Sequence, residues 1–153
     1  LAKKYVDEVN SIGLRIFAAY GPGEEKKQNL SSVINLFLND VAQNNDPVIF
    51  GDGTQTRDFI FIDDAIDGIL NSSESSYQGV LNIGSGISIS FNQIIEKIET
   101  QLDCTISPKY IKKEFSYVED LQADTKLMNS ILKINPISID LGIKKFAQYL
   151  KII

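Results

Sequence analysis

Short apolar runs and helical repeats of apolar residues follow one another along most of the chain. In the runs nearly every position is apolar, which is typical of strands in a parallel sheet because helices cover both of its faces. Between the runs, apolar residues recur at every third or fourth position and predict amphipathic helices. The predicted strands cover residues 14–20, 47–50, 57–62 and 80–83, and the predicted helices cover residues 1–12, 30–44, 64–70, 91–102 and 141–150. Strands that alternate with helices predict an α/β fold.

Small polar residues at the boundaries of these elements are candidate helix caps. Asn, Ser and Asp cap helices because their side-chain oxygens accept hydrogen bonds from N–H groups of the first turn. The candidates are Asn29 or Ser31 for the second helix, Asp63 or Asp64 for the third, and Ser90 for the fourth. For the acid pair we favour a position at the helix start over a metal site. The polar stretch 71–76 then predicts a loop.

The predicted elements form one unit over residues 1–153. A chain of 153 residues with 43% hydrophobic residues can build one core, and no shift in composition marks a second domain. The strands are few and short for a complete doubly wound domain. The chain also starts at Leu1 inside a helical pattern that has no cap. We therefore expect a part of a longer protein.

Charge and residue types argue against several classes of function. The formal net charge is −5, from 20 acidic and 15 basic residues, which argues against a nucleic-acid-binding surface. No run reaches the ~20 apolar residues of a membrane span, so we expect a cytoplasmic protein that does not bind membranes. The chain has no histidine and a single cysteine, Cys104, so we expect neither a Cys/His metal site nor a Ser-His-Asp triad. Cys104 follows a predicted helix, and we expect it to be buried.

Two glycine turns and an arginine are candidates for phosphate binding. Residues 51–56 and 82–89 each lack the third glycine of the dinucleotide-binding fingerprint, so we interpret both as turns. Arg57 follows the first of these turns, at the start of a predicted strand. Its guanidinium could bind a diphosphate through two parallel hydrogen bonds, or it could pair with an acid inside the protein. Spacing alone does not decide between these interpretations.

The charged stretch Glu-Glu-Lys-Lys at residues 24–27 is a candidate for chemistry as well as for a solvated loop. Most stretches of this kind are connectors that face solvent. A lysine can act as a base only where burial or a nearby cation lowers its pKa from ~10.4. Lys26 and Lys27 are adjacent, so either could supply that cation to the other. From composition alone, the connector is the favoured interpretation.

Three motifs together resemble a known enzyme family. They are Arg-Ile-Phe-Ala-Ala-Tyr-Gly-Pro at residues 15–22, Gly-Asp-Gly-Thr-Gln-Thr-Arg-Asp-Phe at 51–59 and Asn-Ile-Gly-Ser-Gly at 82–86. Their order and spacing are similar to the C-terminal half of extended short-chain dehydrogenases/reductases that epimerise or dehydrate nucleotide sugars. The resemblance implies the last strands of a Rossmann-type sheet and a small α/β substrate-binding subdomain, without the N-terminal Rossmann half.

The resemblance also implies what the longer protein does. It would be an NAD(P)-dependent nucleotide-sugar epimerase that binds a nucleotide-diphosphate sugar, with NAD or NADP held mainly by the N-terminal half. The part that precedes Leu1 would carry the catalytic Tyr-x-x-x-Lys motif, so this chain alone would be inactive. The intact protein would be a homodimer.

The family motifs assign roles to individual residues of this chain. Lys27 would be a catalytic base, and Phe17 and Ala19 would contact the cofactor. The substrate-binding residues would be Ala18, Asn29, Phe50, Arg57 and Tyr117. Ala18 stands where the family usually has an asparagine and offers no side-chain hydrogen bond. This departure fits an altered specificity or a loss of activity.

Residues 20–33 are most similar to one branch of the family, the ADP-glycero-manno-heptose 6-epimerases, in which the position of Lys27 holds the second catalytic base. Tyr117 lies five residues before Gln-Ala-Asp at 122–124, the spacing of the substrate-binding tyrosine of that branch. One alternative is an enzyme similar to UDP-glucose 4-epimerase, in which the sugar rotates and Lys27 has no catalytic role. Others are a 4,6-dehydratase and a nucleotide-sugar-binding or interaction domain without activity.

Overall fold

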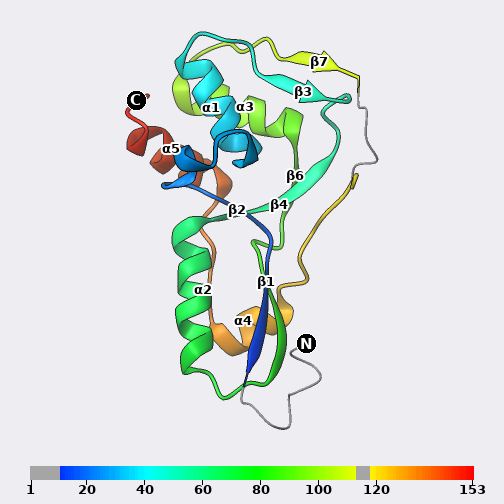
Figure 1. The fold of residues 1–153 in the computed structure, drawn as a ribbon, viewed down its shortest axis with the longest axis vertical. Coiled ribbons are helices and arrows are strands. Elements are labelled where there is room, and N and C mark those ends of the chain that lie inside the picture. The colour runs from blue at the N-terminus through cyan, green and yellow to red at the C-terminus, as the bar shows by residue number, and fades with distance from the viewer. Residues whose placement is uncertain (1–10, 113–117) are drawn as a thin grey trace.

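The computed structural model describes residues 11–112 and 118–153, apart from the side chains of residues 28 and 29 (Figure 1). The strands are β1 (Ile12–Ile16), β2 (Ala18–Tyr20), β3 (Val48–Phe50), β4 (Thr56–Phe61), β5 (Gly79–Ile83), β6 (Ser88–Ser90) and β7 (Lys109–Ile111). The helices are the 3-10 helix η2 (Glu24–Leu30) and the α-helices α1 (Val33–Ala42), α2 (Ile62–Glu74), α3 (Phe91–Leu102), α4 (Lys126–Leu132) and α5 (Ile139–Tyr149). This mixture confirms the predicted α/β class.

The strands form three small sheets. β1 pairs in parallel with β5, and β3 pairs in parallel with β7. In the third sheet β4 lies between β2, which is parallel to it, and β6, which is antiparallel. Figure 1 shows an elongated molecule, with α2 and α4 beside β1 and β5 in one half and with α1, α3 and α5 in the other. The third sheet lies between these halves.

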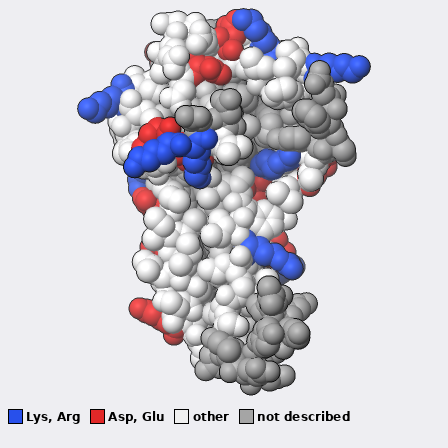
Figure 2. All heavy atoms as spheres, viewed as in Figure 1, with Lys and Arg blue, Asp and Glu red and all other residues white. Residues whose placement is uncertain are grey.

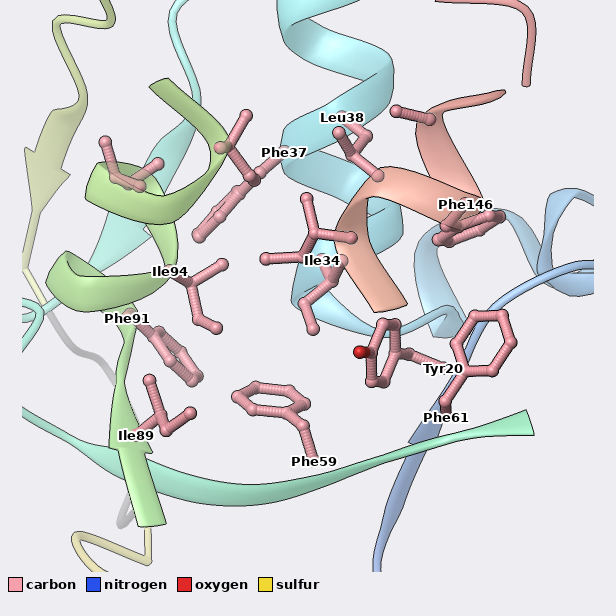
Figure 3. Packing of buried hydrophobic residues seen from close by; sticks show 14 of the residues in the cluster. Tyr20, Ile34, Phe37, Leu38, Phe59, Phe61, Ile89, Phe91, Ile94 and Phe146 are labelled. Carbon is pink, nitrogen blue, oxygen red and sulfur yellow. The ribbon is translucent and has the colours of Figure 1, made fainter. Parts of the chain in front are cut away.

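Two hydrophobic clusters form the core, on opposite faces of β4. Side chains alternate along a strand, so Phe59 and Phe61 belong to one cluster and Ile60 to the other. Figure 3 shows the larger cluster, in which aromatic rings from the sheet pack against residues of α1, α3 and α5. The Tyr20 ring contacts Phe59 and Phe61 edge to face, at centroid distances of 6.2 and 5.6 Å. The smaller cluster packs β1 and β5 against α2 and α4.

The predicted strand at residues 14–20 is wrong in one respect, because it is two strands with different partners. β1 is aligned with β5, whereas β2 is aligned with β4. The change of partner occurs at Phe17, whose N–H donates to the carbonyl of Ile83 at 2.9 Å. We expected burial on both faces apart from Arg15, but Ile16 is exposed as well. Ile12 and Leu14 pack against the smaller cluster, whereas Ile16 belongs to neither described cluster.

The caps of α1 and α3 test the cap predictions. Ser90 caps α3 as predicted, since its hydroxyl accepts from the N–H of Gln93 at 3.2 Å and the Gln93 side chain accepts from the N–H of Ser90 at 2.9 Å. α1 is capped by Ser32, so the predictions of Asn29 and Ser31 as its caps are wrong. The 3-10 helix η2 occupies the preceding residues and delays the start of α1.

The start and end of α2 also differ from the prediction. The helix has no side-chain cap, and Asp63 and Asp64 lie in its first turn, where the helix dipole favours acids. Asp64 accepts instead from the N–H of Ile137 at 3.0 Å, and burial raises the pKa of this carboxyl. α2 continues to Glu74, so most of the predicted loop at 71–76 is helical.

The predicted burial of Cys104 is wrong, one predicted helix lies outside the described residues, and three short elements were not predicted. Cys104 is exposed rather than buried, because α3 ends at Leu102 and the cysteine lies in the loop that follows. The predicted helix at residues 1–12 falls almost entirely outside the described residues, and Ile12 already belongs to β1. The short elements β6, β7 and α4 were not predicted, because so few residues show no clear periodicity.

Gly142 allows α5 to pack closely on the larger cluster. A Cβ atom at this position would overlap the Tyr20 hydroxyl and would lie 3.3 Å from a ring carbon of Phe61, and both of those side chains are buried. Gly142→Ala should therefore lower the free energy of unfolding by about 2 kcal/mol, because overpacking outweighs the ~1 kcal/mol that alanine adds to a helix. Urea unfolding of the chain measures this change.

Gly13→Ala is the matched control for this prediction. A Cβ atom at Gly13 would make only ordinary contacts, at 3.4 Å from a Val80 methyl carbon and 3.8 Å from the Gly79 carbonyl oxygen. We expect Gly13→Ala to leave stability unchanged or to raise it slightly. Equal stability of the two variants would contradict the proposed role of Gly142.

Candidate functional site

A cavity of about 270 Å³ lies between β2, β4 and the segment that leads into α1. We call it the Lys27–Arg57 cavity. The described residues that line it are Ala18, Ala19, Glu24, Lys27, Leu30, Ser31, Ser32, Val33, Arg57, Phe59 and Phe91. The cavity brings together four residues that the sequence predicts to be in the site, namely Ala18, Ala19, Lys27 and Arg57. Two basic residues and two alanines therefore border one small space.

Strand pairing places the walls of this cavity. β2 runs parallel to β4, and Ala18 is aligned with Phe59. Because side chains alternate along a strand, Arg57 and Phe59 project from the same face of β4. Ala18 lies on this face too, and its small side chain leaves space beside Arg57 and Phe59. Ala19 packs against the smaller cluster on the opposite face.

Two backbone carbonyls and an aromatic ring are among the groups that hold Arg57 at the cavity. Its Nη1 donates to the carbonyl of Thr56 at 2.6 Å and to the carbonyl of Glu119 at 3.4 Å. Its guanidinium carbon lies 5.9 Å from the centroid of the Phe91 ring, within range of a cation–π interaction. Arginine keeps its positive charge at every physiological pH. The arrangement therefore presents a fixed cation to an anionic ligand such as a phosphate.

Lys27 lies in η2 beside a buried acid. Its Nζ is 3.7 Å from Oε1 of Glu24, and its side chain is 55% exposed whereas that of Glu24 is 6% exposed. The amine is thus open to solvent on one side and adjacent to a carboxylate on the other. Because Lys27 also lines the cavity, its amine can approach a ligand there and exchange a proton with it. Lys26 is exposed and does not line this cavity.

Two other predicted site residues, Phe17 and Phe50, are not among the described residues that line the Lys27–Arg57 cavity. Phe17 lies between β1 and β2 and is partly exposed. Phe50 ends β3 with its side chain exposed, and its carbonyl accepts from Nε2 of Gln55 at 2.6 Å. The backbone of Asn29 belongs to η2, but its side chain lies outside the described residues, as does all of Tyr117.

Asp58 is a functional candidate that the sequence did not single out. It is fully buried, directly after Arg57. Its Oδ1 accepts from the N–H and the hydroxyl of Ser85, both at 2.7 Å, and its Oδ2 accepts from the N–H of Gly86 at 2.8 Å and of Ala123 at 3.0 Å. The Gly-Ser-Gly stretch at residues 84–86 is therefore a turn whose N–H groups bind a carboxylate. This agrees with the prediction that it is a turn.

A second cavity, of about 500 Å³, lies where the start of α5 faces β6 and α3. Its lining includes Lys97 and Asp140, which form an ion pair at 3.0 Å, together with Phe59, Ile89 and Ile137. Its described lining contains none of Phe17, Ala18, Ala19, Lys27, Phe50 and Arg57. It is larger than the Lys27–Arg57 cavity.

The charge distribution on the surface, the helices and the possible metal ligands of the described residues bear on the classes of function open to the chain. Figure 2 shows acidic and basic side chains interspersed over the face in view, without a broad patch of either sign. In the part of the chain that the structure describes, no helix is both long enough and apolar enough to cross a membrane. The same residues contain no group of His, Cys, Asp and Glu side chains arranged to hold a metal ion.

Comparison with known proteins identifies the family. Residues 1–84, more than half of the chain, match the NAD dependent epimerase/dehydratase family. The chain belongs to this family. The matched region contains β1, β2, η2 and β4, and so it includes every described lining residue of the Lys27–Arg57 cavity except Phe91.

Two of the similar curated proteins are nucleotide-sugar epimerases of different kinds. The UDP-glucuronate 4-epimerase of Thermodesulfobacterium geofontis is 31% identical over 140 residues, which are 90% of this chain and 42% of that protein. The ADP-L-glycero-D-manno-heptose-6-epimerase of Brachyspira hyodysenteriae is 30% identical over 156 residues, which cover 95% of this chain and 48% of that protein. The chain thus spans a little under half the length of these relatives.

Solved structures of epimerases share the fold. The UDP-N-acetylglucosamine 4-epimerase of Methanobrevibacter ruminantium superposes with a TM-score of 0.90 at 25% identity, over 97% of this chain and 49% of that one. The UDP-glucuronic acid 4-epimerase of Bacillus cereus, solved with UDP-glucuronic acid and NAD, gives a TM-score of 0.85 at 27% identity, over 98% of this chain and 48% of that one. The chain therefore has the fold of the C-terminal part of a Rossmann-type epimerase.

Proposed function

We propose that this chain, as one unit over residues 1–153, is the nucleotide-sugar-binding part of an NAD(P)-dependent nucleotide-sugar epimerase. The observation that supports the proposal best is the Lys27–Arg57 cavity, where a fixed guanidinium and an amine share a space lined by small and apolar side chains. The family membership, and the nucleotide sugars bound in related structures, point to the same class of ligand. The resemblance further favours a homodimer, and the lack of a long apolar run in the sequence favours a cytoplasmic location.

The nucleotide sugar would lie along the Lys27–Arg57 cavity. Arg57 would neutralise the diphosphate through charge-assisted hydrogen bonds. Ala18 would face the sugar and leave room for its substituents. Asn29, Phe50 and Tyr117 would contact the rest of the nucleotide sugar, as the resemblance implies.

The chain also offers a place for the reacting end of the cofactor. Phe17 and Gly84 follow the carboxyl ends of the parallel strands β1 and β5, where open α/β sheets bind their ligands. Phe17 is partly exposed there and Ala19 lines the cavity, so both can contact a nicotinamide ring. NAD or NADP, when bound, takes a hydride from a sugar carbon and returns it. Most of its contacts would come from outside this chain.

Lys27 would move a proton at the sugar, on the face opposite a second base outside this chain. This role favours 6-epimerisation, in which the two faces of one carbon are served by two bases. The second candidate is a 4-epimerase, in which the sugar turns over in the site, and relatives of that kind are as similar to this chain as the 6-epimerase. Product analysis with ADP-heptose and UDP-hexose substrates separates the two. The chain alone should show no turnover.

Arg57→Ala should weaken the binding of UDP and ADP to the complete protein by about 10–100-fold, because hydrogen bonds to charged groups contribute about 1.5–3 kcal/mol. Isothermal titration calorimetry measures the dissociation constants. Lys144→Ala is the control, since it removes an exposed cation of α5 that does not line the cavity. Equal affinities of the Arg57→Ala variant and the wild type would contradict the proposed diphosphate site.

A further inference from the structure

Glu24 is a buried acid in the wall of the Lys27–Arg57 cavity. The residue is 5% exposed and begins η2. Lys27 follows three positions later, and in a 3-10 helix residues at this spacing lie on the same side. Both side chains line the cavity. Glu24 is therefore placed to act on Lys27 from within the cavity wall.

Hydrogen bonds hold the Glu24 carboxylate in place. Its Oε1 accepts from the N–H of Ser32 at 2.8 Å, and its Oε2 accepts from the hydroxyl of Ser32 at 2.6 Å and from the N–H of Gly21 at 3.3 Å. Ser32 is the N-cap of α1, and Gly21 directly follows β2. The carboxylate thus ties together the two ends of the segment that carries Lys27.

The amine of Lys27 forms an ion pair with this carboxylate but no hydrogen bond to it. The distance of 3.7 Å between Nζ and Oε1 is that of an ion pair and is too long for a hydrogen bond. The amine therefore keeps its N–H groups available for a ligand. An exposed lysine side chain samples many rotamers, and a fixed neighbouring anion favours those that bring the amine to the cavity.

Glu24 also affects the electrostatic repulsion between the two cations of the cavity. Lys27 and Arg57 are like charges that line the same small space, and Glu24 is the acid among the described lining residues. A carboxylate beside one cation reduces the repulsion between the two. We infer that Glu24 is a positioning residue for Lys27, which holds the lysine amine at the wall of the cavity. This inference rests on the proposed function, since it takes Lys27 to be the group that donates a proton at the sugar.

Glu24→Gln in the complete protein tests the inference through kcat and KM. The amide keeps the size of the side chain but removes its charge. We expect kcat to fall by about 10–100-fold, because a misplaced reacting group costs up to this much, and KM to change little. Glu25→Gln is the matched control, since Glu25 is an exposed neighbouring acid that accepts from the N–H of Gly23 at 2.9 Å. Its kcat and KM should equal those of the wild type.

Ser32→Ala separates positioning from stability. It removes the cap of α1 and one hydrogen bond to Glu24, but it leaves the carboxylate charge beside Lys27. We expect it to lower the Tm at least as much as Glu24→Gln does, and to lower kcat much less. The inference is wrong if Glu24→Gln keeps the wild-type kcat, or if the losses in kcat follow the losses in Tm across the two variants. A wild-type protein without turnover, or full turnover of Lys27→Ala, would instead contradict the proposed function.

Discussion

Lys27→Ala should lower the turnover of the complete protein by about 10²–10⁴-fold, because general acid–base catalysis contributes a factor of this size. The substitution removes the amine but leaves Arg57, the cation proposed to bind the diphosphate, in place. Nucleotide-sugar binding should therefore weaken only slightly. Such a loss in kcat, with binding nearly intact, is typical of a group that acts mainly in the transition state.

Lys26→Ala is the control for this experiment. Lys26 is the adjacent residue, it is exposed, and it does not line the Lys27–Arg57 cavity, so its loss should leave turnover unchanged. Initial rates with ADP-heptose and UDP-hexose substrates provide the measurement, and titration calorimetry provides the affinities. Wild-type turnover in Lys27→Ala would favour a mechanism in which the sugar rotates, and it would return residues 24–27 to the role of a connector.

The fold could be predicted from periodicity where elements are long or apolar, and not where a strand changes partner. The strand predicted at 57–62 agrees with β4 to within one residue at each end. At residues 14–20, by contrast, the hydrophobic run continues through Phe17 although the hydrogen-bonding partner changes there. Periodicity reports the burial of side chains and carries no information on which strand lies alongside.

Caps could be predicted only where the preceding backbone is extended. Ser90 ends a strand and enters α3 directly, so its capping follows from local sequence alone. Before α1, the 3-10 helix η2 occupies the residues that carry the candidate caps, and the cap moves to Ser32. A helix of this kind is short and has no strong sequence signal.

In the candidate site, too, residues within local motifs could be predicted, whereas residues brought in by the packing of distant segments could not. Motifs pointed to Lys27 and Arg57, and both line one cavity. The contributions of Glu24 and Phe91 depend on how η2 and α3 pack against β4, which no spacing in the sequence reveals. Asp58 stands next to Arg57 in a motif, but its partners lie 27 to 65 residues further along the chain. For Glu24, the three-residue spacing to Lys27 was a signal that could have been used.

Asp58→Ala should lower the free energy of unfolding of the chain by about 4 kcal/mol, because each buried N–H group left without an acceptor costs about 1–3 kcal/mol. The substitution removes the acceptor of the N–H groups of Ser85, Gly86 and Ala123 together. Asp58→Asn keeps one side-chain oxygen in the same place, so it should cost less than Asp58→Ala. Urea unfolding followed by circular dichroism measures both changes.

Asp63→Ala separates the effect of buried hydrogen bonds from that of charge. Asp63 is an acid of the same sheet-to-helix region, but its side chain is 65% exposed, and its loss should cost under about 1 kcal/mol. Because Asp58 fixes both the Ser85–Gly86 turn and the segment around Ala123 next to Arg57, Asp58→Asn in the complete protein should also weaken the binding of UDP and ADP. If Asp58→Ala were no more destabilising than Asp63→Ala, the buried carboxylate would not be what joins these segments, and the anchoring of Arg57 would need another explanation.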